Sequence, residues 1–70
     1  MYQIRFVELK SAKMLQDYSF YRCHNLETII IPKVEEIQDS CFDFCFQLSY
    51  VEANELKIVG KNCFIEAAAE

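Results

Sequence analysis

The chain has 70 residues and a formal net charge of −4, and 53% of its residues are hydrophobic while 26% are charged. A chain this apolar folds rather than staying disordered, and its length allows one domain at most. The acidic charge argues against binding to a nucleic-acid backbone, and the apolar runs are far shorter than the roughly 20 residues that span a bilayer. We therefore expect neither a nucleic-acid partner nor membrane insertion.

Four cysteines raise the question of the redox compartment. In a short secreted chain they would indicate a disulfide framework. Residues 1–10, however, contain no basic region followed by an apolar core, so no signal peptide is seen. The localisation is unknown, and a reducing, cytoplasmic compartment is the default expectation.

The chain repeats itself at a constant interval of about 22 residues, a period within the range of stacked repeat proteins. Phenylalanine recurs at this interval in Phe20, Phe42 and Phe64, and Cys23 and Cys45 are also separated by it. When the chain is aligned with itself in this way, seven columns are apolar in every copy, which is typical of a stacked repeat protein. The alternative is an amphipathic α+β mini-domain in which the spacing is accidental.

The repeat predicts strands near residues 4–9, 26–31 and 48–53. Three consecutive isoleucines at 29–31 favour a strand in the middle copy, because β-branched side chains fit a pleated surface. Pro32 follows them and has no amide hydrogen to donate, so we expect strand pairing to end there.

Return segments that lead to the next strand are expected at residues 17–23, 39–45 and 61–67. The middle segment has an acidic start and apolar residues at i, i+3 and i+4 spacing. This pattern predicts one or two helical turns in each return.

Residues 25–37, followed by Phe42 and Cys45, resemble the BspA-like leucine-rich repeat family. The family pattern runs leucine, isoleucine-proline, valine, isoleucine, an aromatic-x-x-cysteine and a new leucine. The resemblance implies a right-handed solenoid used for adhesion or protein contact, often on microbial or protist surfaces, and no catalytic residues. The implied fold class is an α/β repeat rich in β-structure, a leucine-rich-repeat solenoid of three coils with short parallel strands and short helical or irregular returns. Each coil would take up one repeat, roughly 22 residues.

The middle copy alone matches the family pattern completely, since Lys10 and Asn54 stand where the other two copies would have proline. Residues 1–66 are expected to form the three coils. Residues 67–70 are expected to be a C-terminal tail or a partial fourth repeat.

In a solenoid each coil covers only its neighbours, so the apolar columns should stack into one continuous interior. The predicted structural core consists of Phe20, Phe42, Phe64, Leu26, Ile29, Ile31, Ile37, Cys23 and Cys45. Three coils are near the minimum for such an array, and no polar cap is evident at either end. Open ends expose apolar side chains and unpaired strands, so we expect a homo-oligomer. Pairing of like ends would close the assembly, while head-to-tail stacking would extend it into a filament.

Outward strand positions form the surface that most leucine-rich solenoids use for binding. The candidate binding residues on this surface are Phe6, Glu8, Thr28, Ile30, Tyr50 and Glu52. Aromatic side chains beside carboxylates are typical of a protein-binding patch. The alternative is an ordinary solvated sheet face.

The cysteines and the single histidine could in principle carry chemistry. The closest cysteine pair, Cys41 and Cys45, does not have C-x-x-C spacing and no second pair follows, so no metal or other cofactor is expected. Side chains in register on stacked coils point the same way, which favours buried free thiols over disulfides. His24 directly follows Cys23, and adjacent side chains usually diverge, so a cysteine–histidine nucleophile is not expected.

These observations favour a non-enzymatic protein-interaction module, either self-associating or part of a longer array. The alternative is a small acidic regulator that inhibits an enzyme by binding to a basic surface. A third possibility is a metal-stapled mini-domain, which would unfold on chelation.

Overall fold

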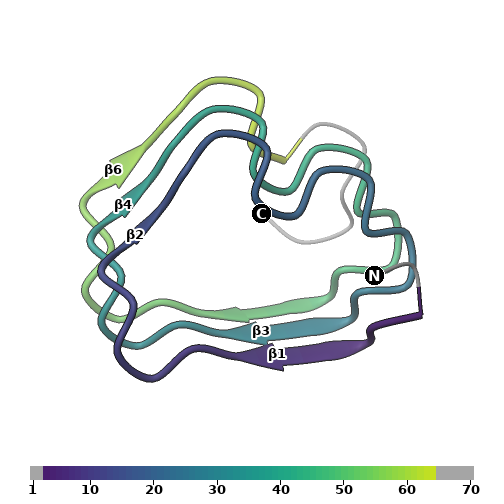
Figure 1. The fold of residues 1–70 in the computed structure, drawn as a ribbon, viewed down its shortest axis with the longest axis horizontal. Coiled ribbons are helices and arrows are strands. Elements are labelled where there is room, and N and C mark those ends of the chain that lie inside the picture. The colour runs from purple at the N-terminus through teal and green to yellow at the C-terminus, as the bar shows by residue number, and fades with distance from the viewer. Residues whose placement is uncertain (1–2, 65–70) are drawn as a thin grey trace.

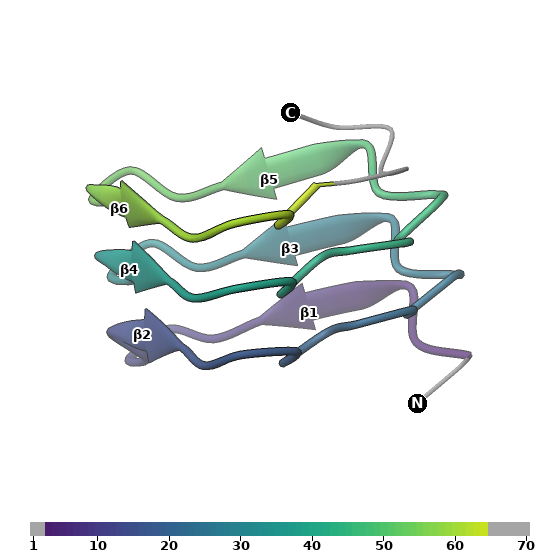
Figure 2. The same cartoon turned by 90° about the horizontal axis from the view of Figure 1, so that it is seen from above.

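The computed structural model describes residues 3–64, which wind into a stack of coils (Figures 1 and 2). Each coil carries two short strands. The strands are β1 (Phe6–Glu8), β2 (Met14–Leu15), β3 (Thr28–Ile30), β4 (Glu36–Ile37), β5 (Tyr50–Glu52) and β6 (Ile58–Val59). Helix is absent from residues 3–64, so this part of the chain has no long apolar helix of the kind that crosses a membrane.

The strands form two parallel sheets that face different sides of the coil, one in the order β1-β3-β5 and one in the order β2-β4-β6 (Figure 1). Val7 pairs with Ile29, and Ile29 pairs with Val51. Partners thus occupy equivalent positions of successive repeats, as the sequence predicts. The three predicted strands are confirmed but are shorter than expected, and the second sheet was not predicted.

The returns are built from turns rather than helices. The helical turns predicted for residues 17–23 and 39–45 are absent, and the irregular alternative is found; the third return, 61–67, lies partly outside the described residues. Backbone hydrogen bonds explain this difference. The amides of Tyr18 and Phe20 donate to carbonyl groups of the next coil, while those of Ser19 and Tyr21 donate to the residue three positions back. A helix directs its amides along its own axis and could not also join the coils.

The interior consists of the repeating apolar columns. The fully buried aliphatic side chains of the middle coil are Leu26, Ile29, Ile31, Val34 and Ile37. The three phenylalanines stack across the coils, with ring centroids 5.7 Å apart for Phe20 and Phe42 and 5.4 Å apart for Phe42 and Phe64. Phe42 is fully buried because a ring covers each of its faces, whereas Phe20 and Phe64 are half-buried. The predicted division between coils at 1–66 and tail at 67–70 lies outside the described residues.

All four cysteines are buried free thiols. Three of them donate to a carbonyl oxygen of the preceding coil: Cys41 to Gln16 at 3.0 Å, Cys45 to Phe20 at 3.1 Å and Cys63 to Gln38 at 2.9 Å. These thiols therefore link the coils as well as filling the interior. Burial raises the pKa of Cys45 to about 11, and it also raises the pKa values of Cys23 and Cys41.

Replacing Phe42 with alanine should unfold the chain. The substitution removes the middle ring of the stack, and truncation of a buried phenylalanine typically costs about 3–5 kcal/mol, a large share of the stability of a small domain. Thermal unfolding followed by circular dichroism measures the effect. Phe44→Ala is the matched control, because Phe44 lies outside the repeating columns and is only half-buried. Equal losses of melting temperature in the two variants would contradict the proposed packing.

Stability should decrease in alkaline solution. The folded pKa of Cys45, about 11, lies above its ordinary value of 9.0, so the unfolded chain loses the thiol proton first. The stabilisation is fully present below pH 9.0 and is lost as the pH rises toward about 11. Urea unfolding at a series of pH values measures this decrease. Cys45→Ser keeps a hydrogen-bond donor for the Phe20 carbonyl group but does not ionise in this range, so the stability of this variant should decrease less with pH. If the variant loses as much stability with pH as the unsubstituted chain, Cys45 is not the source of the decrease.

Candidate functional site

The outer face of the β1-β3-β5 sheet brings the six predicted binding residues together. The register aligns Phe6, Thr28 and Tyr50 in one row and Glu8, Ile30 and Glu52 in a second row. The residues between the two rows point to the interior, because successive side chains of a strand alternate between its faces. We call this set of six residues the strand face.

The strand face exposes two aromatic rings. Phe6 is 59% exposed and Tyr50 is 52% exposed, whereas Thr28 between them is half-buried. The Tyr50 hydroxyl donates to Oε1 of Glu52 at 3.3 Å, which orients both side chains. Glu8 supplies a second carboxylate at the opposite edge of the sheet. The strand face therefore offers apolar rings and negative charge to a partner.

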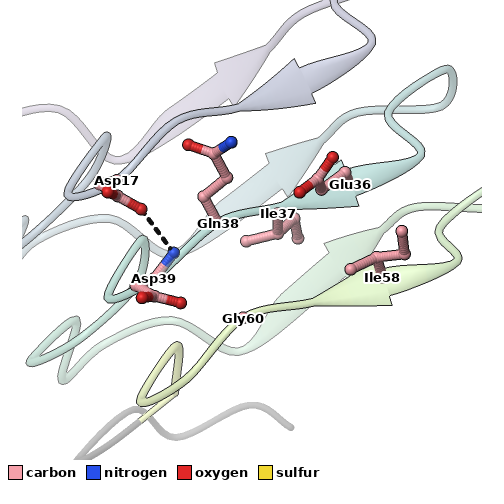
Figure 3. Close-up of a pocket in the computed structure, with 7 residues that line it drawn as sticks. All are labelled: Asp17, Glu36, Ile37, Gln38, Asp39, Ile58 and Gly60. Atoms are coloured by element: carbon pink, nitrogen blue, oxygen red, sulfur yellow. Dashed lines mark hydrogen bonds between the residues drawn. The ribbon is translucent and has the colours of Figure 1, made fainter.

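A shallow hollow of about 290 Å³ lies beside the other sheet (Figure 3). It is lined by Asp17, Glu36, Ile37, Gln38, Asp39, Ile58 and Gly60. Two of its carboxylates bind backbone groups: Oδ1 of Asp17 accepts from the Asp39 amide, and Oδ1 of Asp39 accepts from the Lys61 amide, both at 2.9 Å. Among residues 3–64, no group of histidine, cysteine, aspartate or glutamate side chains has the arrangement of a metal site. The hollow therefore belongs to the scaffold that joins the coils.

Gly60 allows the second and third coils to pack closely beside this hollow. A β-carbon at Gly60 would lie 2.5 Å from Oδ1 of Asp39 and 2.7 Å from the carbonyl carbon of Gln38. Real β-carbon contacts are longer than this, so any other residue would push the two coils apart. The single glycine of the chain is thus explained by packing rather than by a ligand.

Cys23 and His24, the adjacent thiol and imidazole, do not share an environment. Cys23 is buried and its pKa is raised by burial, which disfavours the nucleophilic thiolate. His24 is exposed, and its ring lies against Phe46 with 4.9 Å between the ring centroids. The pair therefore lacks the geometry of an activated nucleophile.

A cluster of aromatic side chains that the repeat does not predict lies on the returns between β2 and β3 and between β4 and β5. Together with Arg22, which lies over two of the rings, we call it the aromatic ridge; its aromatic members are Tyr18, Tyr21, His24, Phe44 and Phe46. Its rings contact one another with centroid distances of 5.1 Å for Tyr18–Tyr21, 5.9 Å for Tyr21–Phe44, 6.0 Å for Phe44–Phe46 and 4.9 Å for His24–Phe46. The signal in the sequence is a concentration of aromatic residues outside the apolar columns, which a search for repeating columns passes over.

Comparison with known proteins agrees with this architecture. Residues 2–69 match the family described as BspA type Leucine rich repeat region (6 copies). No curated protein and no solved structure matches the chain. Leucine-rich repeats commonly mediate protein interactions and are generally not enzymes. The match covers nearly the whole sequence, and the chain therefore belongs to the BspA-type leucine-rich repeat family.

Proposed function

We propose that the chain is a non-enzymatic protein-interaction module that binds a partner protein through the strand face. The observation that carries this proposal is the pair of exposed rings, Phe6 and Tyr50, held with carboxylates on one sheet. Buried aromatic anchors supply much of the energy of protein interfaces. The matching partner surface presents apolar side chains near basic groups, which pair with Glu8 and Glu52.

The sheet beneath the strand face supports this role because it is already ordered. Backbone hydrogen bonds between coils hold β1, β3 and β5 in one register. A surface held in this way loses little conformational entropy when a partner binds, so more of the contact energy appears as affinity.

We also propose that the chain associates with a second copy through its end coils. Val7 in the first coil and Val51 in the third are half-buried, whereas their counterpart in the middle coil, Ile29, is fully buried. Covering one end surface with the like end of a second copy would bury its apolar side chains, a favourable change of about 25 cal/mol per Å².

The charges on the coils favour pairing of like ends over head-to-tail stacking. Continuing the same register from one copy to the next would place Glu52 against Glu8 and Lys57 against Lys13. Within the chain, by contrast, Glu35 of the middle coil forms an ion pair with Lys57 at 3.9 Å. Like charges directly opposite one another destabilise a sheet, so a closed two-fold dimer is preferred to a filament.

Substitution of both exposed rings, Phe6→Ala with Tyr50→Ala, should abolish partner binding and leave the fold intact. Both side chains are more than half exposed, so they contribute little to the interior. Each anchor lost should weaken binding by about tenfold or more. The measurement is capture of partner protein on the immobilised chain, followed by titration of the captured partner.

Ile58→Ala is the matched control for this experiment, because Ile58 is an exposed apolar residue of the other sheet. Retention of the partner by the control and its loss from the double variant would support the strand face. Equal binding by all three proteins would exclude it. A steep loss of binding with added salt would instead favour the acidic regulator, since exposed charge pairs are screened and apolar contacts are not.

Light scattering on the purified chain should show a dimer that dissociates on dilution and does not grow beyond two copies. The apolar side chains of the end coils supply the driving force. Of Val7→Lys and Val51→Lys, the one that lies at the paired end should reduce association by placing a charge in the contact. A monomer mass at every concentration would contradict association of the end coils. A mass that rises continuously with concentration would indicate head-to-tail stacking instead.

A further inference from the structure

The aromatic ridge exposes large apolar rings that the interior does not need. Tyr18 is 59% exposed and Phe46 is 46% exposed, and neither belongs to the columns that stack between coils. The rings contact one another across two successive returns, so they form one continuous surface rather than scattered side chains. Continuous exposed aromatic surface is typical of a contact site for another molecule.

The backbone beneath the ridge is one that large side chains disfavour. Tyr18, Arg22 and Phe44 have φ angles of 61°, 60° and 61°, in the left-handed region. The residues equivalent to Tyr18 in the next two coils are Ser40 and Asn62, which have nearly the same φ, and asparagine suits this conformation better. Tyr18 gains little from burial in return. The left-handed conformation recurs at this position in every described coil, so the fold requires it. An exposed, bulky Tyr18 at this position, where Asn62 stands in the third coil, points to a role in function.

Arg22 gives the ridge a fixed positive charge. Its guanidinium carbon lies 5.4 Å from the centroid of Tyr21 and 5.2 Å from that of Phe44. Among residues 3–64, the ion pairs are Arg5–Glu27 and Lys57–Glu35, and neither includes Arg22. The neighbouring Asp43 is buried, 7% exposed, and it takes part in neither of these two ion pairs.

These observations favour an acidic ligand over a basic one. Arg22 already lies over the rings of Tyr21 and Phe44, and its positive charge repels a second cation at this place and attracts an anion. A guanidinium held against two rings is orientated before binding and can pair with a carboxylate through two parallel hydrogen bonds. The adjacent ring of Phe46 is exposed and offers an apolar contact.

We propose that the aromatic ridge is a second protein-contact surface, separate from the strand face, and that it binds an extended segment of a partner protein in which an acidic side chain lies beside an aromatic or aliphatic one. The carboxylate pairs with Arg22, and the apolar side chain packs against Phe44 and Phe46. This surface is independent of the strand face, because it lies on the returns and shares no residue with the β1-β3-β5 sheet.

Selection of a displayed library of random linear peptides against the immobilised chain tests the proposal. Peptides with aspartate or glutamate next to an aromatic or aliphatic residue should be enriched, and the best of them, synthesised with a fluorescent label, should bind in an anisotropy titration. Arg22→Gln should weaken that binding by about tenfold or more. Arg5→Gln is the matched control, because it removes the same charge from an exposed arginine outside the ridge and should leave the affinity unchanged.

A second variant separates binding from folding. Phe46→Ala removes an exposed ring that lies outside the apolar columns and contacts the proposed ligand, so the melting temperature should change little while the peptide binds more weakly. The Phe6→Ala, Tyr50→Ala variant should bind the same peptide normally, which keeps this result distinct from that of the strand face. Enrichment of peptides without acidic residues, failure to enrich any peptide, or equal loss of binding in Arg22→Gln and Arg5→Gln would each overturn the proposal.

Discussion

Stacking of equivalent residues in successive coils is the constraint on which the rest of the structure depends. The parallel register places each side chain against its counterpart in the next coil, so apolar residues meet apolar residues and rings meet rings. The backbone follows the same rule, since amides of one coil donate to carbonyl groups of the next even in the turns. The fold, its interior and its two surfaces all follow from this single geometric relation.

This constraint distributes stability unevenly. Among residues 3–64, the middle coil alone has a described coil on both sides, and its apolar side chains are fully buried, while equivalent residues of the outer coils, such as Val7 and Val51, are partly exposed. In stacked repeats, stability is close to a sum of contacts between neighbours. With so few neighbours, the phenylalanine stack, the thiol-to-carbonyl bonds and the aspartate-to-amide bonds each account for a larger share than they would in a long array.

The sequence was sufficient to predict the parts of the structure that repeat. The interval between Phe20, Phe42 and Phe64 identified the stacked rings, and alternation along the strands identified which residues share the strand face. The β2-β4-β6 sheet was missed because two-residue strands are too short to show alternation.

The helical turns were wrongly predicted because inward residues of a tight turn, such as Cys41 and Cys45, have the spacing of a helix face. The aromatic ridge could not be predicted from apolar columns. Tyr21 meets Phe44 diagonally between neighbouring returns, and His24 and Phe46 share a column that is not apolar in every copy.

The bonds from one aspartate to the next coil also limit how such a chain can change in length. The Asp17 carboxylate accepts a hydrogen bond from the Asp39 amide, and the Asp39 carboxylate accepts one from the Lys61 amide. The two partners are equally far apart along the chain in both bonds. Loss or insertion of one residue within a coil would shift every later residue out of line with the coil before it. Gain or loss of an entire winding leaves all other partners matched. We therefore expect tolerated insertions and deletions in such arrays to come in complete windings.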